Sequence, residues 1–213
     1  MTTSREKILT RLRTQRRDVE TPPPVWRSRR HFDDLAARFS EALIKVHGEA
    51  TRAESWNDAL DRLAETLQAL NARCIVVNDE PLLSEMDWAG HWPELTWHMV
   101  GRTAGDLRAF CTSADVGLST AEAALAETGS IVVTSGPGKS RLATLLPPVH
   151  IALVPISRLT TDIFTWAAQR QGSLPAAMTI ISGPSKTADI EQTMAIGVHG
   201  PKRFIVILYD EGG

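Results

Sequence analysis

Phe204-Ile205-Val206-Ile207-Leu208 is the stretch that decides the fold class, because five apolar residues follow one another without a polar one. A strand with one face in water alternates apolar and polar side chains, whereas an unbroken run is typical of a strand buried on both faces. Such strands occur mainly in parallel sheets that helices cover on each side. Four other short runs, each rich in apolar residues and each expected to be a strand, precede this one: Cys74–Val77, Ile131–Val133, Ile151–Val154 and Met178–Ile181.

Segments with helical periodicity alternate with these strands. Apolar residues recur every three or four positions from Leu35 to Val46, and again up to Leu70 after Ser55, whose hydroxyl can cap a helix. The alternation predicts a doubly wound α/β domain, with a mostly parallel sheet and helices on both faces. Ligands of such domains bind at the carboxyl ends of the strands. Three further helices are expected over Ala121–Glu127, Thr160–Gln171 and Thr187–Ile196.

The composition is that of a globular protein with an ordinary core. The chain has 213 residues, of which 43% are hydrophobic and 23% charged, and its net charge of −2 favours neither nucleic acid nor a membrane surface. No apolar run reaches membrane-spanning length, and Met1–Leu12 lacks the apolar core of a secretion signal, so we expect a cytoplasmic protein. Cys74 and Cys111 are too few to hold a zinc ion or a cubane iron–sulfur cluster without outside ligands, and we expect both to be structural.

Residues 1–30 differ from the rest and are expected to form a basic arm and a proline-rich linker ahead of one domain over residues 31–213. Nine of the thirty are Arg or Lys, a short amphipathic helix is expected over Ser4–Arg13, and Pro22–Pro24 favours an extended backbone. A charge run of this kind is usually a solvated face. The alternative is docking to an acidic partner surface or to RNA.

The segment Trp88–His98 holds three of the six tryptophans and two of the six histidines. One interpretation is a loop and sheet edge packed by large rings. The other is a contact surface, because tryptophan is enriched at binding hot spots. The spacing of His91 and His98 is not that of a metal site.

The loop Gly136-Pro137-Gly138-Lys139-Ser140 follows a strand and looks like a phosphate-binding loop. The full motif requires a glycine at the position of Val133, so we do not expect a nucleotide triphosphatase. The dinucleotide fingerprint and the hydrolase nucleophile elbow are also missing from the sequence. Lys139 and Arg141 could meet an anionic ligand or could be solvated loop charges.

Two later segments carry candidate site residues. We expect a helix to end at Thr128-Gly129, which leaves Glu127 either in a crevice or as a surface carboxylate. In Ile181–Glu191 a buried strand leads into a Gly-Pro turn and an expected helix, whose amino end favours an anion beside Lys186. The candidate anion-binding residues at this turn are Ser182, Gly183, Ser185, Lys186 and Thr187, with Asp189 in the first helical turn. Simple capping and turn chemistry is the other interpretation.

His199 lies between glycines, in Gly197-Val-His-Gly-Pro201. Glycine on both sides lets the backbone approach other groups closely. His199 is therefore a candidate acid, base or carboxylate-binding group, although a lone histidine is more often structural.

Four blocks of the sequence together resemble a known family. They are residues 126–133 (AETGSIVV), 141–150 (RLATLLPPVH), 182–191 (SGPSKTADIE) and 197–201 (GVHGP). In content, order and spacing they resemble the blocks of the LUD domain. The extent of the chain, from the arm to the last strand, resembles that of proteins in the lactate-utilisation protein C family. The resemblance covers essentially the whole chain and is densest over residues 112–210.

The resemblance implies a Rossmann-like fold of the NagB/RpiA/CoA-transferase type. It also implies a role in the oxidation of L-lactate to pyruvate, together with two iron–sulfur partner proteins. The blocks map onto Glu127, Thr128, Gly129, Arg141, His150, Ser182, Gly183, Ser185, Lys186, Asp189, His199 and Gly200. Among them, Glu127 and His199 are our candidate catalytic residues. The candidate ligand-binding residues are Thr128, Gly129, Arg141, Ser182, Gly183, Ser185, Lys186, Thr187, Asp189 and Gly200.

Lactate oxidation requires an electron acceptor, and the sequence shows no cofactor motif. We therefore expect a non-redox subunit or accessory protein without a cofactor of its own, which binds a small carboxylate or phosphate while iron–sulfur subunits carry the electrons. The alternative is a stand-alone enzyme on a small anionic (carboxylate, phosphate or CoA-linked) substrate, with Glu127 as nucleophile or base and with Lys186 and His199 holding the anion. A ligand sensor without turnover is a third interpretation.

Overall fold

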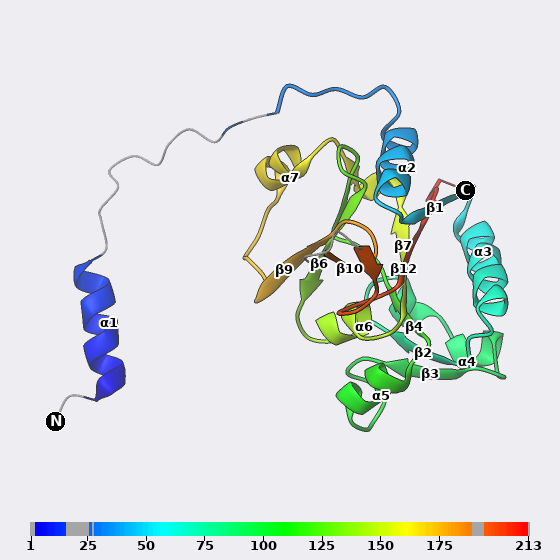
Figure 1. The fold of residues 1–213 in the computed structure, drawn as a ribbon, viewed down its shortest axis with the longest axis horizontal. Helices are drawn as coiled ribbons and strands as arrows, with labels where there is room; N and C mark the ends of the chain where they lie inside the picture. Colours follow the sequence, from blue (N-terminus) through cyan, green and yellow to red (C-terminus); the bar gives the residue numbers. More distant parts are fainter. Residues whose placement is uncertain (1–2, 16–25, 27, 189–193, 213) are drawn as a thin grey trace.

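The computed structural model describes residues 3–15, 26, 28–188 and 194–212. The expected amino-terminal helix is present as α1 (Ser4–Thr14), and none of its residues is buried. Figure 1 shows α1 as a separate helix and the rest of the described chain as an α/β body. Among the described residues, no helix is both long enough and apolar enough to cross a membrane.

A six-stranded parallel sheet forms the centre of the body. Its strands stand in the order β1-β12-β7-β4-β2-β3, and every neighbouring pair is parallel. The longest pairing joins β12 to β7 over seven residues, from Arg203 opposite Val149 to Tyr209 opposite Pro155. The bounds are β1 (Glu49–Ala53), β2 (Cys74–Val77), β3 (Thr96–Met99), β4 (Val116–Ser119), β7 (Val149–Pro155) and β12 (Arg203–Tyr209).

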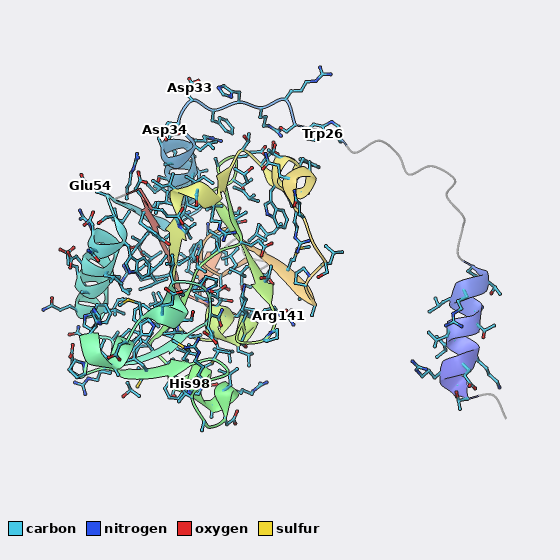
Figure 2. The ribbon with its side chains drawn as sticks, turned by 180° about the vertical axis from the view of Figure 1, so that it is seen from behind. Trp26, Asp33, Asp34, Glu54, His98 and Arg141 are labelled. Atoms are coloured by element: carbon cyan, nitrogen blue, oxygen red, sulfur yellow. The ribbon has the colours of Figure 1, made fainter. Side chains whose placement is uncertain are left out.

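Apolar side chains fill both faces of this sheet. Along β12, Ile205 and Ile207 pack on one side with α3 (Trp56–Ala69), while Phe204, Val206 and Leu208 pack on the other with α2 (Leu35–Lys45). Figures 1 and 2 show α3 on one side and a second sheet on the opposite side. This double burial explains the unbroken apolar run in β12 and confirms the predicted α/β class. Short helices complete the cover: α5 (Leu107–Ser113), α6 (Arg141–Leu145), η1 (Leu83–Glu85) and η2 (Ile156–Arg158).

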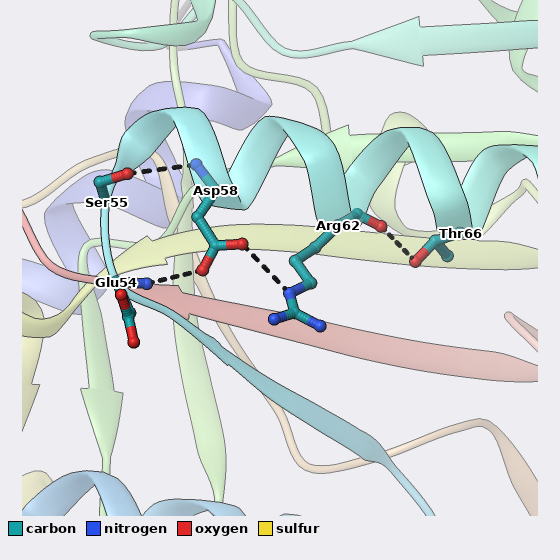
Figure 3. A network of polar contacts seen from close by, with 5 residues as sticks. All are labelled: Glu54, Ser55, Asp58, Arg62 and Thr66. Carbon is teal, nitrogen blue, oxygen red and sulfur yellow. Dashed lines mark hydrogen bonds and ion pairs between the residues drawn. The ribbon is translucent and has the colours of Figure 1, made fainter.

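The start of α3 confirms the predicted cap at Ser55. The Ser55 hydroxyl accepts a hydrogen bond from the Asp58 amide at 3.2 Å. The Asp58 carboxylate in turn accepts from the Glu54 amide at 2.9 Å and from Arg62 at 3.3 Å (Figure 3). The Ser55 contact satisfies an amide group that the first turn of a helix leaves without a partner, and the Asp58 carboxylate joins the residue before the cap to the second turn.

The tryptophan-rich segment forms α4 (Trp88–His91) and leads into the edge strand β3. Trp88 is buried and stacks on Trp92 and Trp97, with ring centroids 5.8 and 4.9 Å away. His98 is buried in β3 against Phe110, and this burial lowers its pKa. The rings therefore pack a sheet edge, as the first interpretation of this segment predicts.

A second sheet, of order β8-β5-β6-β9, corrects three predictions. The expected helix Ala121–Glu127 is instead strand β5, antiparallel to β6, and the runs Ile131–Val133 and Met178–Ile181 belong to this sheet rather than to the parallel one. Ala124 faces the main core while Leu125 faces α7, so burial on both sides removes the periodicity that separates helix from strand. The bounds are β5 (Ala123–Leu125), β6 (Ser130–Ser135), β8 (Leu159–Thr160), β9 (Ala177–Ile181) and α7 (Ile163–Gln169).

Two other expected helices also differ from the prediction. The helix expected over Thr160–Gln171 is the shorter α7, because Asp162 caps its start at the Thr165 amide. The helix expected over Thr187–Ile196 is a hairpin of β10 (Lys186–Ala188) and β11 (Met194–Ile196). Hydrogen bonds from Gly197 to Ser185 and from Ser185 to Pro201 close the base of this hairpin, and such pairings override the local helical preference.

Gly129 adopts the left-handed conformation in the β5–β6 turn, not at the end of the helix that its sequence context predicts. Its φ is +63°, and a Cβ there would lie 2.2 Å from the Leu43 nitrogen. We expect Gly129→Ala to lower the free energy of unfolding by about 2–4 kcal/mol, through backbone strain and the clash with α2. Gly136→Ala is the matched control, because a Cβ at Gly136 meets nothing within 4 Å. Urea unfolding of both variants measures the difference, and equal losses would contradict the clash.

Candidate functional site

The strand order of the parallel sheet has a switch point between β2 and β4. The chain leaves β2 for β3 on one side and leaves β4 for β7 on the other, so the connections diverge at this point. In open α/β sheets the crevice at such a switch point, beyond the carboxyl ends of the strands, is where ligands bind. Polar residues gather there: Asn78, Asp79 and Glu80 follow β2, and Thr120 follows β4.

Glu80 is the most unusual of these residues, because its side chain is only 4% exposed. Its Oε2 accepts a hydrogen bond from the Thr120 amide at 2.8 Å, and its Oε1 lies 3.9 Å from the Lys139 Nζ. Burial raises the pKa of the Glu80 carboxyl, a change that the Thr120 bond and the Lys139 charge oppose and the Glu122 charge reinforces. Glu80 therefore binds a proton more readily than an ordinary glutamate.

The loop 136–140 brings Lys139 to Glu80. The Asp79 amide donates to the Gly138 carbonyl at 2.8 Å, and the Ser140 amide donates to the Asn78 Oδ1 at 3.0 Å. Gly138 has a φ of +72°, and a Cβ there would lie 2.8 Å from the Asp79 Cβ, so only glycine allows this close approach. The loop that fails the phosphate-loop test thus still lies against the carboxyl end of β2 and places a lysine beside Glu80.

An ion pair fixes the segment after β2. Two nitrogens of Arg102 contact the Asp79 carboxylate at 2.7 and 2.9 Å, and a third donates to the Ser84 carbonyl at 2.9 Å. A bidentate arginine–carboxylate contact fixes geometry more firmly than a single bond does. The segment after β2 is therefore fixed on the side of β3 as well as by the loop 136–140.

A shallow cavity of about 260 Å³ lies beyond Glu122, which belongs to its lining together with Arg158, Trp166 and Arg170. The Arg170 Nε is 3.5 Å from the Glu122 Oε1, while its outer nitrogens contact the carbonyls of the loop after α7. Glu122 thus lines this cavity, and its negative charge also raises the pKa of Glu80.

The predicted residues around the β5–β6 turn have other partners. The Glu127 carboxylate pairs with Arg30 at 3.1 Å, and its backbone carbonyl accepts from Arg38. Thr128 and Ser182 are brought together through Ser130, with hydroxyl distances of 2.7 and 2.6 Å. No contact found among the described residues joins Glu127 to Lys186 or His199.

The predicted anion site at the second turn lacks its helix. Lys186 is exposed at the start of β10, and its Nζ lies 2.9 Å from the His47 Nδ1. Gly200 packs against Ser185, whereas His199 is exposed. The described residues 182–188 therefore offer no helix amino end to an anion. Gly183 follows β9, Thr187 pairs with Ala195 in the hairpin, and Asp189 lies outside the described residues.

Two other residues from the family blocks are placed as follows. Arg141 is the exposed first residue of α6, after the loop 136–140 (Figure 2). His150 is buried in β7, where its Nε2 lies 2.8 Å from the Ser119 hydroxyl and its Nδ1 has no partner among the described residues. Burial lowers the pKa of His150 to about 3, so this side chain is neutral and belongs to the core.

Sequence reasoning missed Asn78, Glu80 and Thr120. The available signal was a buried strand followed at once by Asn-Asp-Glu, which places three polar side chains at a carboxyl end. Together with Lys139 they can hold a small anion and exchange a proton with it. Among the described residues no group of three potential ligands could hold a metal ion.

The raised pKa of Glu80 predicts a specific pH dependence of stability. The folded chain keeps the Glu80 proton to higher pH than the unfolded chain, so ionisation above the ordinary pKa of 4.5 destabilises the folded state. Glu80→Gln keeps the shape and an acceptor for Thr120 but removes the charge. We expect the stability of the wild type to fall relative to Glu80→Gln as pH rises from about 4 to about 8, measured by urea unfolding. A stability difference independent of pH would contradict the raised pKa.

Comparison with known proteins shows the family to which the chain belongs. The LUD domain family matches residues 36–209. Lactate utilization protein C of Exiguobacterium sp. is 34% identical over 227 residues, covering 97% of this chain and 96% of its own, and that of Halalkalibacterium halodurans is 31% identical, covering 84% and 80%. The protein of the same name from Bacillus subtilis is 26% identical and covers 96% of this chain and 94% of its own.

The fold has a counterpart among solved structures. The crystal structure of a DUF162 family protein from Deinococcus radiodurans matches with a TM-score of 0.55 and 21% identity, covering 82% of this chain and 96% of that one. At this identity the likeness concerns the fold alone. The matched family and the curated relatives identify the chain as a member of the LUD domain family and, within it, of the lactate utilization protein C family.

Proposed function

We propose that this chain serves bacterial L-lactate utilisation, the oxidation of L-lactate to pyruvate, as a non-redox subunit or accessory protein in the cytoplasm. The observation that carries the proposal is the likeness to several proteins named lactate utilization protein C over 84–97% of this chain. Their name states a pathway rather than a reaction, so the role within the pathway rests on the chemistry of the chain.

Electrons are proposed to pass through iron–sulfur partner proteins. The oxidation removes two electrons from lactate and requires an acceptor. Iron–sulfur clusters are held by cysteine thiolates, and this chain has only two cysteines. Burial raises the pKa of the Cys111 thiol to about 11, which keeps it protonated and unsuited to ligate a metal. These facts support the assignment of electron transfer to other subunits.

The crevice between β2 and β4 is the proposed site for the small anion. Lys139 is only 30% exposed there and lies beside Glu80. A 2-hydroxy acid such as lactate offers a carboxylate for the lysine and a hydroxyl for the buried carboxyl, so its two functional groups match the two side chains. The turn around Lys186 is the second location, and it is weaker because it lacks a helix amino end.

A stand-alone enzyme on a small carboxylate, phosphate or CoA-linked substrate is the second candidate function. The observation in its favour is Glu80, a buried carboxyl with a raised pKa at the place where α/β enzymes bind substrates. In this function Glu80, rather than Glu127, is the proposed acid or base. Glu127 is paired with Arg30 instead, at 3.1 Å.

Thermal unfolding tests the proposed anion site with two matched lysine variants. We expect L-lactate at about 100 times its dissociation constant to raise the melting temperature by roughly 5–10 °C, because it binds only the folded chain. Lys139→Ala should remove this shift and Lys186→Ala should retain it. Propionate, which lacks the 2-hydroxyl, should give a smaller shift. The reverse pattern between the two lysines would place the site at the Lys186 turn.

Purification from cells grown on L-lactate separates the two functions. For a subunit, we expect the tagged chain to bring down proteins with iron–sulfur absorbance, and the purified chain alone to leave L-lactate unchanged. Turnover of a small anionic substrate by the chain alone, lost in a folded Glu80→Gln variant, would instead favour the stand-alone enzyme.

A further inference from the structure

Charge is divided unevenly along the chain. Residues 1–30 hold nine of the 23 basic residues and three of the 25 acidic ones, a net charge of +6. The remaining residues, 31–213, hold 14 basic and 22 acidic residues, a net charge of −8. The small overall charge thus conceals a basic arm joined to an acidic body, and two such parts attract each other.

The helix α1 carries apolar side chains that need a partner. Ile8 and Leu12 lie one turn apart on the same face and are each 60% exposed. Thr3 and Glu6 form a capping box, which defines the start of the helix. An isolated helix of 11 residues is nevertheless marginal in water, so its stability depends on covering that face.

The body contains a groove of suitable size and charge. It has a volume of about 910 Å³ and runs between α3 and the segment Trp92–Leu95. Asp61, Ala64 and Glu65 face it from α3, three and four residues apart, and Glu94 faces it from the other wall. Ala64 leaves room at the centre, while Trp92 and Leu95 supply apolar surface.

The dimensions and charges of the groove match α1. The wall from Asp61 to Asn71 is about 15 Å long, and an 11-residue helix is about 16 Å long. Three acidic side chains line the groove against one basic one, Arg73, whereas α1 carries four basic residues. An amphipathic helix in a groove of complementary charge is a recurring mode of recognition.

The place where the arm joins the body lies on the opposite side of the body from the groove of the same chain. Trp26 contacts Phe164 of α7 with ring centroids 4.4 Å apart, and Arg30 pairs with Glu127. The helix α7 packs on the second sheet, on the face of the parallel sheet opposite to α3 (Figure 1).

The chain between α1 and the body is short for this path. The twelve residues from Thr14 to Trp26 span at most about 40 Å. The layers between α7 and α3 are together about 30 Å thick, and a path round the sheet edge is longer than that. The helix therefore meets the groove of another molecule more readily than its own.

We propose that α1 of one copy binds in the groove between α3 and Trp92–Leu95 of a second copy. Ile8 and Leu12 cover the apolar surface of Trp92 and Leu95, and the arginines of α1 face the acidic side chains of the groove. Reciprocal exchange of the two arms closes a symmetric dimer, in which both grooves are filled. This dimer does not depend on the ligand of the crevice at Glu80.

Sedimentation equilibrium of the full chain tests this dimer. We expect a dimer at micromolar concentration in about 0.1 M salt that dissociates as salt rises, because the charge attraction is screened. Leu12→Asp changes a side chain of α1 that is exposed, so the body should fold unchanged while the dimer becomes a monomer. A chain that is monomeric at all concentrations, or a dimer that Leu12→Asp leaves intact, would overturn the proposal.

A charge exchange tests the pairing of arm and groove. Arg11→Glu and Glu65→Arg should each weaken dimerisation roughly tenfold, and the double variant should recover most of the loss. Glu41→Lys, an exposed change on α2 away from the groove, is the matched control and should leave the dimer unchanged. Additive losses in the double variant, without recovery, would refute this placement of α1.

Discussion

Burial of the parallel sheet on both faces is the constraint on which the rest of the structure depends. β12 and β7 pair over seven residues at its centre, and their side chains alternate between two apolar cores. Leaving either face in water would expose some of the largest buried side chains of the molecule, including Phe204 and Ile207. The chain therefore needs a helix layer on one face and a second layer of equal extent on the other.

The second layer explains the position of the proposed site. Residues 120–136 fold back over the sheet as β5 and β6 before the chain returns as β7, and the loop that ends β6 reaches the carboxyl end of β2. There it brings Lys139 over Glu80, which the cover of the sheet has already removed from water. Packing thus creates the raised pKa of Glu80, and the same loop supplies the charge that opposes it.

The elements that could be predicted from sequence are those whose burial leaves a pattern. Unbroken apolar runs predicted β7 and β12, and apolar periodicity predicted α2 and α3.

The β5–β6 hairpin could not be predicted in this way, because its alanine-rich first strand is buried on both sides and shows no period. The β10–β11 hairpin is closed by hydrogen bonds from Ser185 to Pro201 and from Gly197 to Ser185, contacts that no local pattern records. The anion site was predicted at the amino end of the helix expected there, and the hairpin has no helix dipole that would favour an anion. The cluster around Glu80 was not predicted because its contacts join residues about forty and sixty positions apart.

Glu80 and Lys139 make anion binding and proton binding interdependent in the proposed site. Lys139 lowers the pKa of Glu80 through its positive charge, while burial and Glu122 raise it. An anion that pairs with Lys139 neutralises the lowering influence and adds a negative charge beside the carboxyl, so the pKa of Glu80 rises further. By linkage, protonation of Glu80 strengthens anion binding to the same degree. In the proposed site, a carboxylate ligand with a hydroxyl group would therefore bind more tightly when Glu80 is protonated, and the protonated carboxyl could donate a hydrogen bond to that ligand.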